Sequence, residues 1–144
     1  MEKTLRCLLI DDDVDDHRIF EMALEEVDKE IVLITAINGD DGIVKLSLMG
    51  ADIPDFIFLD INMPRMNGLD CLRELGKMKF VNKPRIFMYS TAGTDRLRLQ
   101  ARELGAEDFI VKPSEITILT SILANIFISP KPDRGNTESK LTTA

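Results

Sequence analysis

Three aspartates are the residues of this sequence best placed for chemistry, because each follows an apolar run. Asp11 and Asp12 come after the apolar residues 8–10, and Asp60 comes after the apolar residues 56–59. Carboxylate oxygens bind hard divalent cations, and a carboxylate can also attack phosphorus as a nucleophile. Either chemistry requires that the three residues meet in the fold.

Ser90 and Lys112 stand in the same relation to two other apolar stretches. Ser90 follows residues 85–89, and Lys112 follows residues 106–111. A lysine ammonium neutralises charge on a bound anion, and a serine hydroxyl can donate a hydrogen bond to it. Taken alone, each residue also has a simpler interpretation: Ser90 as a turn residue, Lys112 as a surface lysine, and the acidic run 11–16 as a helix cap.

The apolar runs predict the strands that must position these residues. Continuous apolar runs bounded by turn signals are typical of strands buried on both faces of a parallel sheet. Segments with apolar residues at helical spacing lie between them, so five strands alternate with five helices. This predicts an α/β fold with a doubly wound five-stranded parallel sheet, for which 2-1-3-4-5 is a common strand order. The strands are expected at residues 5–10, 31–36, 56–59, 85–89 and 106–111, the second being the least apolar and suited to an edge.

All C-terminal ends of parallel strands lie on one edge, where the aspartates, the serine and the lysine would converge. Three carboxylates at close range cannot all stay ionised unless a cation lies between them or some of them hold a proton. Mg²⁺ with oxygen ligands is the natural solution, and the backbone carbonyl of Asn62 can supply a further oxygen. Asp60 would then accept a phosphoryl group, while Lys112 neutralises charge on that group.

Composition argues against several other classes of protein. The chain has 144 residues, which suits one domain, and 44% of them are hydrophobic and 30% charged. The net charge of −7 argues against direct binding to nucleic acid through a basic surface. No run has the length of a membrane span, and no signal peptide is found. We therefore expect a cytoplasmic protein in which Cys7 and Cys71 are free buried thiols.

Capping residues and a change in composition predict where elements end. Asp13 and Ser114 are expected to cap the first and last helices. Pro113 either occupies the first turn of the last helix or follows a cis peptide bond. Helical periodicity stops near residue 128, so we expect one domain over residues 1–128 and a disordered tail over residues 129–144.

Four segments together resemble the receiver domain of two-component response regulators, in particular stand-alone receivers. They are residues 8–13, residues 59–64 with Asn67-Gly68 after them, residues 88–92 and residues 111–113. Each is a weak signal alone, but their order and spacing are specific, and the resemblance covers about residues 5–128. It implies a flavodoxin-like receiver fold and a phosphoacceptor switch that at most phosphorylates and dephosphorylates itself.

The resemblance also implies a role for each residue at the predicted edge. Asp60 is the phosphorylated aspartate. Asp11 and Asp12 form the acidic pocket for Mg²⁺ together with Asp60 and the backbone carbonyl of Asn62, and Lys112 contacts the phosphoryl group. The donor is a phosphohistidine on a histidine kinase or a phosphotransfer protein.

A switch that links this site to a partner surface is implied as well. Ser90 is the switch hydroxyl, and Phe109 is the aromatic switch partner three residues before Lys112, without the hydroxyl of a tyrosine. Phosphorylation is expected to draw Ser90 toward the phosphoryl group, to let Phe109 turn inward and to alter the face of residues 94–127. An unidentified downstream protein would dock on that face, with homodimer formation left open. Asn62 and Ala92 occupy the positions at which dephosphorylation is tuned in this family.

Three other functions are weighed against this one. A Mg²⁺-dependent phosphohydrolase that forms an aspartyl phosphate is the main alternative, since Asp60-Ile61-Asn62 is similar to its DxD motif; its nucleophile, however, usually follows the first strand. A flavin-binding module would need a hydroxyl- and glycine-rich loop where residues 11–13 are acidic. A receiver used only for docking is disfavoured by the full set of site residues.

Overall fold

Five parallel strands form the central sheet, in the order β2-β1-β3-β4-β5. The computed structural model describes residues 4–91 and 93–132. The strands are β1 (Arg6–Ile10), β2 (Val32–Ala36), β3 (Phe56–Leu59), β4 (Arg85–Ser90) and β5 (Asp108–Val111). The predicted strand order is confirmed, and β2 lies at an edge as its weaker apolar character indicates.

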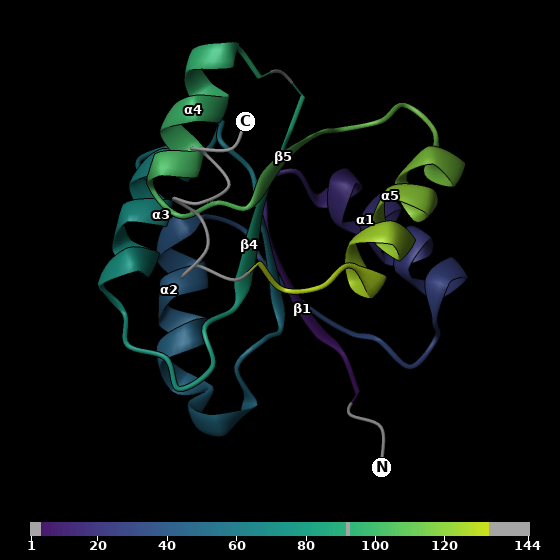
Figure 1. The fold of residues 1–144 in the computed structure, drawn as a ribbon, viewed down its shortest axis with the longest axis horizontal. Helices are drawn as coiled ribbons and strands as arrows, with labels where there is room; N and C mark the ends of the chain where they lie inside the picture. The colour runs from purple at the N-terminus through teal and green to yellow at the C-terminus, as the bar shows by residue number, and fades with distance from the viewer. Residues whose placement is uncertain (1–3, 92, 133–144) are drawn as a thin grey trace.

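Helices cover both faces of this sheet. They are α1 (Val14–Val27), α2 (Gly39–Leu48), α3 (Gly68–Lys77), α4 (Asp95–Glu103) and α5 (Ile116–Ile128), and a short 3₁₀ turn, η1 (Gly50–Asp52), follows α2. Figure 1 shows α2, α3 and α4 on one face and α1 beside α5 on the other, which confirms the doubly wound, flavodoxin-like fold. Within the described ranges, no helix is long and apolar enough to cross a membrane.

Alternation along the strands divides the hydrophobic core into two halves. Leu8 and Ile10 of β1 belong to the half under α2, α3 and α4, whereas Cys7 and Leu9 belong to the half under α1 and α5. The second half contains most of the aromatic rings, those of Phe20, Phe56, Phe58, Phe87, Tyr89 and Phe127. Fully burying a large apolar side chain contributes about 1.5–3 kcal/mol. The sheet is therefore a firm support for the residues at its ends.

The helix caps agree with the sequence at one end of the chain and differ at the other. Asp13 caps α1 as predicted, since its side chain accepts a hydrogen bond from a backbone N–H of the first turn. The prediction that Ser114 caps the last helix is wrong. α5 begins at Ile116, and its cap residue, Glu115, makes no capping bond, because the loop after β5 continues for one residue beyond Ser114. The peptide bond before Pro113 is trans.

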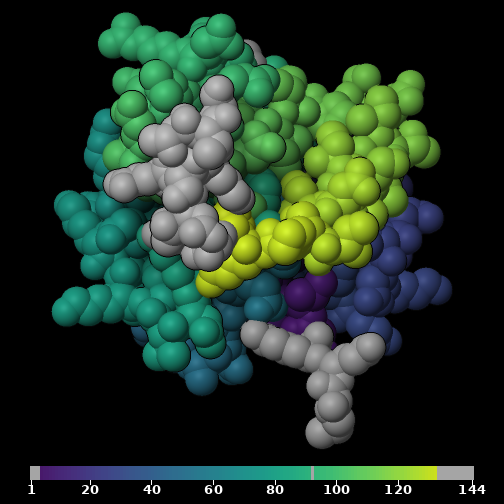
Figure 2. Space-filling model, viewed as in Figure 1, coloured from purple at the N-terminus to yellow at the C-terminus, as the bar shows by residue number. Residues whose placement is uncertain are grey.

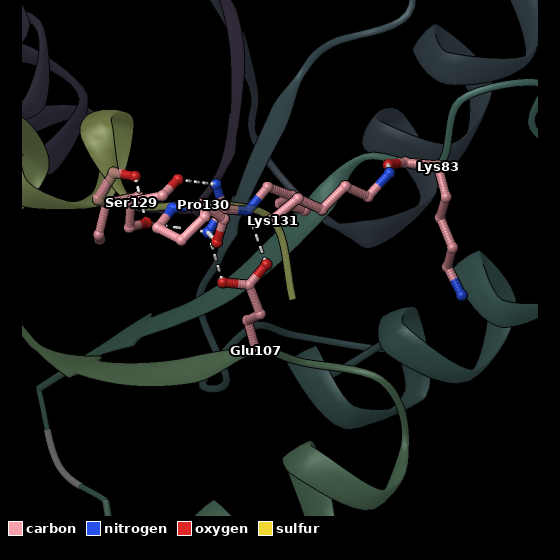
Figure 3. Close-up of polar contacts among 7 residues, drawn as sticks. Lys83, Glu107, Ser129, Pro130 and Lys131 are labelled. Atoms are coloured by element: carbon pink, nitrogen blue, oxygen red, sulfur yellow. Dashed lines mark hydrogen bonds and ion pairs between the residues drawn. The ribbon is translucent and has the colours of Figure 1, made fainter. Parts of the chain in front are cut away.

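At the N-terminal edge of the sheet, Arg85 joins the start of β4 to the end of α5. Figure 3 labels its partners Glu107, Ser129 and Pro130. The guanidinium of Arg85 donates hydrogen bonds of 2.7 and 2.8 Å to the two carboxylate oxygens of Glu107. It also donates to the carbonyl and hydroxyl oxygens of Ser129 and to the carbonyl oxygen of Pro130. This cluster, which we call the Arg85 clamp, ties the chain that follows α5 to the edge of the sheet.

The clamp includes residues that the sequence assigns to a disordered tail. Residues 129–132 are described, and Figure 2 shows the chain after α5, in yellow, running across the face in view. Lys131 adds a longer hydrogen bond of 3.4 Å from Nζ to the carbonyl of Lys83. The rest of the predicted tail, residues 133–144, lies outside the described residues.

Candidate functional site

Asp11 and Asp60 lie side by side at the C-terminal edge of the sheet, because β1 and β3 are paired in parallel. The backbone N–H of Asp60 donates to the carbonyl of Ile10 at 3.0 Å, so the ladder continues one residue beyond β3. Both side chains are buried, with exposed fractions of 0% for Asp11 and 4% for Asp60. Asp12 is exposed, and carboxylate oxygens of the three residues lie within 4.8 Å of one another. The fold thus brings the three aspartates together.

Lys112 joins this cluster from the end of β5. Its backbone N–H donates to the carbonyl of Ser90 at 2.8 Å, which sets the residue beside the end of β4. Its Nζ lies 2.8 Å from Asp11 Oδ2 and 3.5 Å from Asp60 Oδ2. Burial alone would lower the pKa of Lys112, but the carboxylates of Asp11 and Asp16 hold that pKa above its usual value. Lys112 therefore supplies a cation whose side chain is only 9% exposed.

Asp11 is the carboxylate whose environment opposes its charge most clearly. Its Oδ1 accepts a hydrogen bond of 2.9 Å from the backbone N–H of Asp13. Its Oδ2 accepts no hydrogen bond of good geometry from the described residues, although Lys112 is close. Burial raises the pKa of Asp11 to about 6, and the charge of Asp60 adds to the effect while Lys112 opposes it. Asp11 therefore presents a buried oxygen that a cation would stabilise.

Two residues of α1 also contact the site, although the sequence alone does not assign them to it. Asp16 Oδ2 lies 2.6 Å from Lys112 Nζ, and His17 Nε2 lies 2.7 Å from the carbonyl oxygen of Asp11. The sequence predicts Asp16 only as an acid that suits the helix dipole. No pattern in the sequence relates Asp16 to the strand ends, because Asp12 precedes α1 and helical spacing does not connect the two residues.

The loop after β3 holds Asp60 in place through a close backbone contact. The N–H of Gly68 donates to the carbonyl of Ile61 at 2.8 Å, and a side chain at Gly68 would overlap the carbonyl oxygen of Asp60. Arg65, in the same loop, has a φ of 66°, a left-handed conformation that is uncommon for residues other than glycine. Asn62 is exposed in this loop, and its carbonyl as a metal ligand stays a prediction.

Ser90 and Phe109 lie on the adjacent strands β4 and β5. Ser90 is fully buried, and its hydroxyl has no hydrogen-bond partner among the described residues. The ring of Phe109 is also buried, against Gly93 on one side and with the Arg98 guanidinium 5.1 Å from the ring centroid. The predicted inward turn of Phe109 would therefore start from a ring that is already packed. Ala92 lies outside the described residues.

The three aspartates suit a hard divalent cation. All of their ligand atoms are oxygens, and the buried Oδ2 of Asp11 already attracts one cation, the Lys112 ammonium 2.8 Å away. Mg²⁺ prefers oxygen ligands and usually keeps several waters, which the exposure of Asp12 permits. The three aspartates could therefore hold a hard divalent cation such as Mg²⁺.

The site is a cluster at the rim of the sheet and does not coincide with a large cavity. A hollow of about 650 Å³ lies at the opposite edge, where Pro54, Phe80 and Arg85 contribute to its lining. None of the three aspartates lines it. The local chemistry, and not the volume of a pocket, identifies the functional edge.

The chain is similar to known proteins both in sequence and in fold. The family model for the response regulator receiver domain matches residues 7–124. The chain is 39% identical over 117 residues to a protein-glutamate methylesterase/protein-glutamine glutaminase of Desulfotalea psychrophila, covering 80% of this chain and 31% of that protein. It is 33% identical over 113 residues to Protein CcdB of Bacillus subtilis, covering 78% of this chain and 92% of that one. The chain thus spans about a third of the first relative and most of the second.

A solved structure gives the same result. The chain matches the CheX–CheY–BeF3–Mg complex of Borrelia burgdorferi with a TM-score of 0.73 and 28% identity, covering 87% of this chain and 90% of that chain. These matches do not favour the phosphohydrolase alternative. Because the family model spans most of the chain and contains every residue of the aspartate and lysine cluster, the chain belongs to the response regulator receiver domain family of two-component signalling systems.

Proposed function

We propose that this receiver accepts a phosphoryl group on Asp60 from a phosphohistidine donor. A carboxylate oxygen of Asp60 attacks phosphorus, the P–N bond of the donor breaks, and the electron pair leaves with the imidazole. The observation that carries the proposal is the position of Lys112, whose Nζ lies 3.5 Å from Asp60 Oδ2 inside a largely buried cluster. The ammonium is placed to neutralise charge on the transferring group.

Ser90 supports the same function. A buried hydroxyl without a partner costs about 1–3 kcal/mol. A phosphoryl oxygen on Asp60 would give the Ser90 hydroxyl an acceptor, so phosphorylation would recover that cost. Ser90 is thereby the residue that senses the phosphoryl group.

The three aspartates and the carbonyl of Asn62 are the residues that would hold Mg²⁺. When bound, the ion supplies positive charge that offsets the charge of the transferring group. Asp11 and Asp12 come from the end of β1 and Asp60 from the end of β3, so binding needs no rearrangement of the sheet. Asp60 keeps a second oxygen for the attack on phosphorus.

The output surface is the face formed by α4, β5 and α5. Leu99, Val111 and Ile118 are apolar side chains on these elements with exposed fractions of 58%, 43% and 47%. Exposed apolar side chains of this kind suit a protein partner. Val111 is paired with Ser90 across β4 and β5, so the proposed sensing hydroxyl lies on the strand next to this face. The partner is a downstream protein or a second copy of the receiver.

Labelling with acetyl phosphate, or with a cognate kinase, tests the acceptor. The wild-type chain should gain one phosphoryl group that depends on Mg²⁺, and Asp60→Asn should gain none. Asp70→Asn is the matched control, because Asp70 is a surface residue in an exposed pair with Arg73. Undiminished labelling of Asp60→Asn would overturn the proposal.

Capture of partners with and without beryllofluoride, an analogue of the phosphoryl group, tests the output. A protein retained in only one of the two states, and lost in a Leu99→Glu variant, identifies the downstream partner. Equal capture of every partner in both states contradicts the switch.

A further inference from the structure

The shortest contact of Lys112 is with a residue that the proposed transfer does not use. Its Nζ lies 2.6 Å from Asp16 Oδ2, compared with 2.8 Å from Asp11 and 3.5 Å from Asp60. Asp16 is neither the acceptor nor one of the three clustered aspartates. The lysine is thus held by a carboxylate that stands outside the reacting group.

The contact between Lys112 and Asp16 is largely hidden from solvent, and α1 holds Asp16 in place. The side chain of Lys112 is 9% exposed and that of Asp16 is 20% exposed, so salt in the solvent screens the pair only weakly. Asp16 belongs to the first turn of α1, and α1 packs beside α5 across the sheet face. The carboxylate therefore cannot follow the lysine far if the ammonium moves toward Asp60.

We propose that Asp16 is a positioning residue that competes with the phosphoryl group for Lys112. This inference rests on the proposed phosphorylation of Asp60. A phosphoryl group on Asp60 needs the ammonium as a partner, whereas Asp16 already engages it in a charged hydrogen bond. Asp16 also adds a negative charge beside the place that an anion must enter. The carboxylate of Asp16 therefore slows phosphorylation and weakens binding of phosphoryl analogues.

Asp16→Asn tests this competition, with Asp15→Asn as the matched control. Both changes remove one negative charge from the first turn of α1, but the side chain of Asp15 is exposed. The measurements are the labelling rate with acetyl phosphate and the beryllofluoride concentration that half-saturates the Mg²⁺-loaded chain. For Asp16→Asn the rate should rise, and the half-saturating concentration fall, by about tenfold, the change expected from loss of one charged hydrogen bond. Asp15→Asn should stay within about twofold of the wild type.

Two further variants separate positioning from a general effect of charge. In a Lys112→Gln background, where labelling is slower, Asp16→Asn should change the rate by less than about twofold, because the coupling between the two residues is lost. In the chain that retains Lys112, Asp16→Glu keeps the carboxylate, so its labelling rate should be close to that of the wild type.

The possible outcomes are distinct. A slower or unchanged rate in Asp16→Asn, or an equal gain in the Lys112→Gln background, overturns the inference. Persistent labelling of Asp60→Asn instead overturns the proposed function. Labelling that depends on Asp60 but shows no gain in Asp16→Asn overturns only the competition.

Discussion

Both edges of the sheet place a basic residue against carboxylates, but only one of the two clusters has its hydrogen bonds complete. At the N-terminal edge, the guanidinium of Arg85 donates to five acceptor atoms on Glu107, Ser129 and Pro130. The rings of Phe56 and Phe87 lie 5.3 and 5.8 Å from its central carbon. All three nitrogen atoms of the guanidinium donate hydrogen bonds, and two aromatic rings lie near its central carbon.

At the C-terminal edge the balance is different. Lys112 is one cation among several carboxylates, and its longest ion pair, 3.5 Å, is with Asp60. Ser90 Oγ is buried without a hydrogen-bond partner among the described residues, and Asp11 Oδ2 has only Lys112 Nζ, 2.8 Å away, which it shares with Asp16 and Asp60. Buried polar groups that lack partners cost stability, whereas a complete network stabilises the fold and leaves nothing for a ligand. The comparison indicates that the clamp is structural, whereas the aspartate cluster could still take up a metal ion.

The largest expected effect is on the stability of the clamp. Arg85→Met leaves the Glu107 carboxylate without its partner, so we expect the free energy of unfolding to fall by about 3 kcal/mol. Urea unfolding measures it. Arg73→Met is the control, because the Arg73–Asp70 pair is exposed, and its removal should cost less than about 0.5 kcal/mol. Equal losses in the two variants would contradict the structural role of the clamp.

The second prediction concerns the close approach beneath Asp60. Gly68→Ala places a methyl group against the Asp60 carbonyl oxygen, so we expect a loss of about 2 kcal/mol and slower labelling of Asp60. Gly76→Ala, in the same helix, meets no neighbouring atom and should instead stabilise the chain by up to about 1 kcal/mol. Thermal unfolding and acetyl phosphate labelling of both variants check this. Unchanged stability and labelling of Gly68→Ala would contradict this prediction, because the loop could then move aside for the methyl group.

In the third prediction, removal of a charge raises the free energy of unfolding, whereas at the clamp it lowers that free energy. The pKa of Asp11 is raised from 3.8 to about 6, so the folded chain binds this proton more tightly than the unfolded chain. Without Mg²⁺, its contribution to stability therefore falls as pH rises through that interval and stays low at neutral pH. Asp11→Asn should flatten this part of the pH profile and stabilise the metal-free chain by about 1 kcal/mol at neutral pH.

Asp12→Asn is the control for this variant. Because Asp12 is exposed, its substitution should leave the stability of the metal-free chain almost unchanged. Both variants should lose most of the stabilisation that added Mg²⁺ gives the wild type. Destabilisation of the metal-free chain by Asp11→Asn would contradict the view that the ionised carboxylate of Asp11 destabilises the metal-free fold.

The last prediction concerns two buried thiols that lie outside both clusters and whose substitution is not needed for the test. Burial raises the pKa values of Cys7 and Cys71 to about 12, and nearby carboxylates add to the shift. Because the thiolate is the reactive form, both thiols should react far more slowly with a thiol reagent in the native chain than in the urea-unfolded chain. Fast labelling of the native chain would show that the core opens. Because burial in the core is enough to raise these two pKa values, a raised pKa alone does not mark a functional residue.

The sequence by itself determined the fold class and the convergence of the strand-end residues at one edge of the sheet. Acids after residues 8–10 and 56–59, and Lys112 after residues 106–111, had to converge, because parallel strands carry their C-terminal ends to the same side. The strand order followed from a common arrangement of this fold class, and the free, buried state of both cysteines followed from their apolar neighbours.

Only the tertiary structure decided the contacts that depend on how elements are oriented. Asp16 meets Lys112 because α1 is rotated so that this residue faces the end of β5, and helical spacing alone does not specify that rotation. Ser129 belongs to the Arg85 clamp because α5 ends above the start of β4, a placement set by packing over the whole sheet. Local patterns specify which residues lie at a strand end, whereas the packing of helices on the sheet selects their partners.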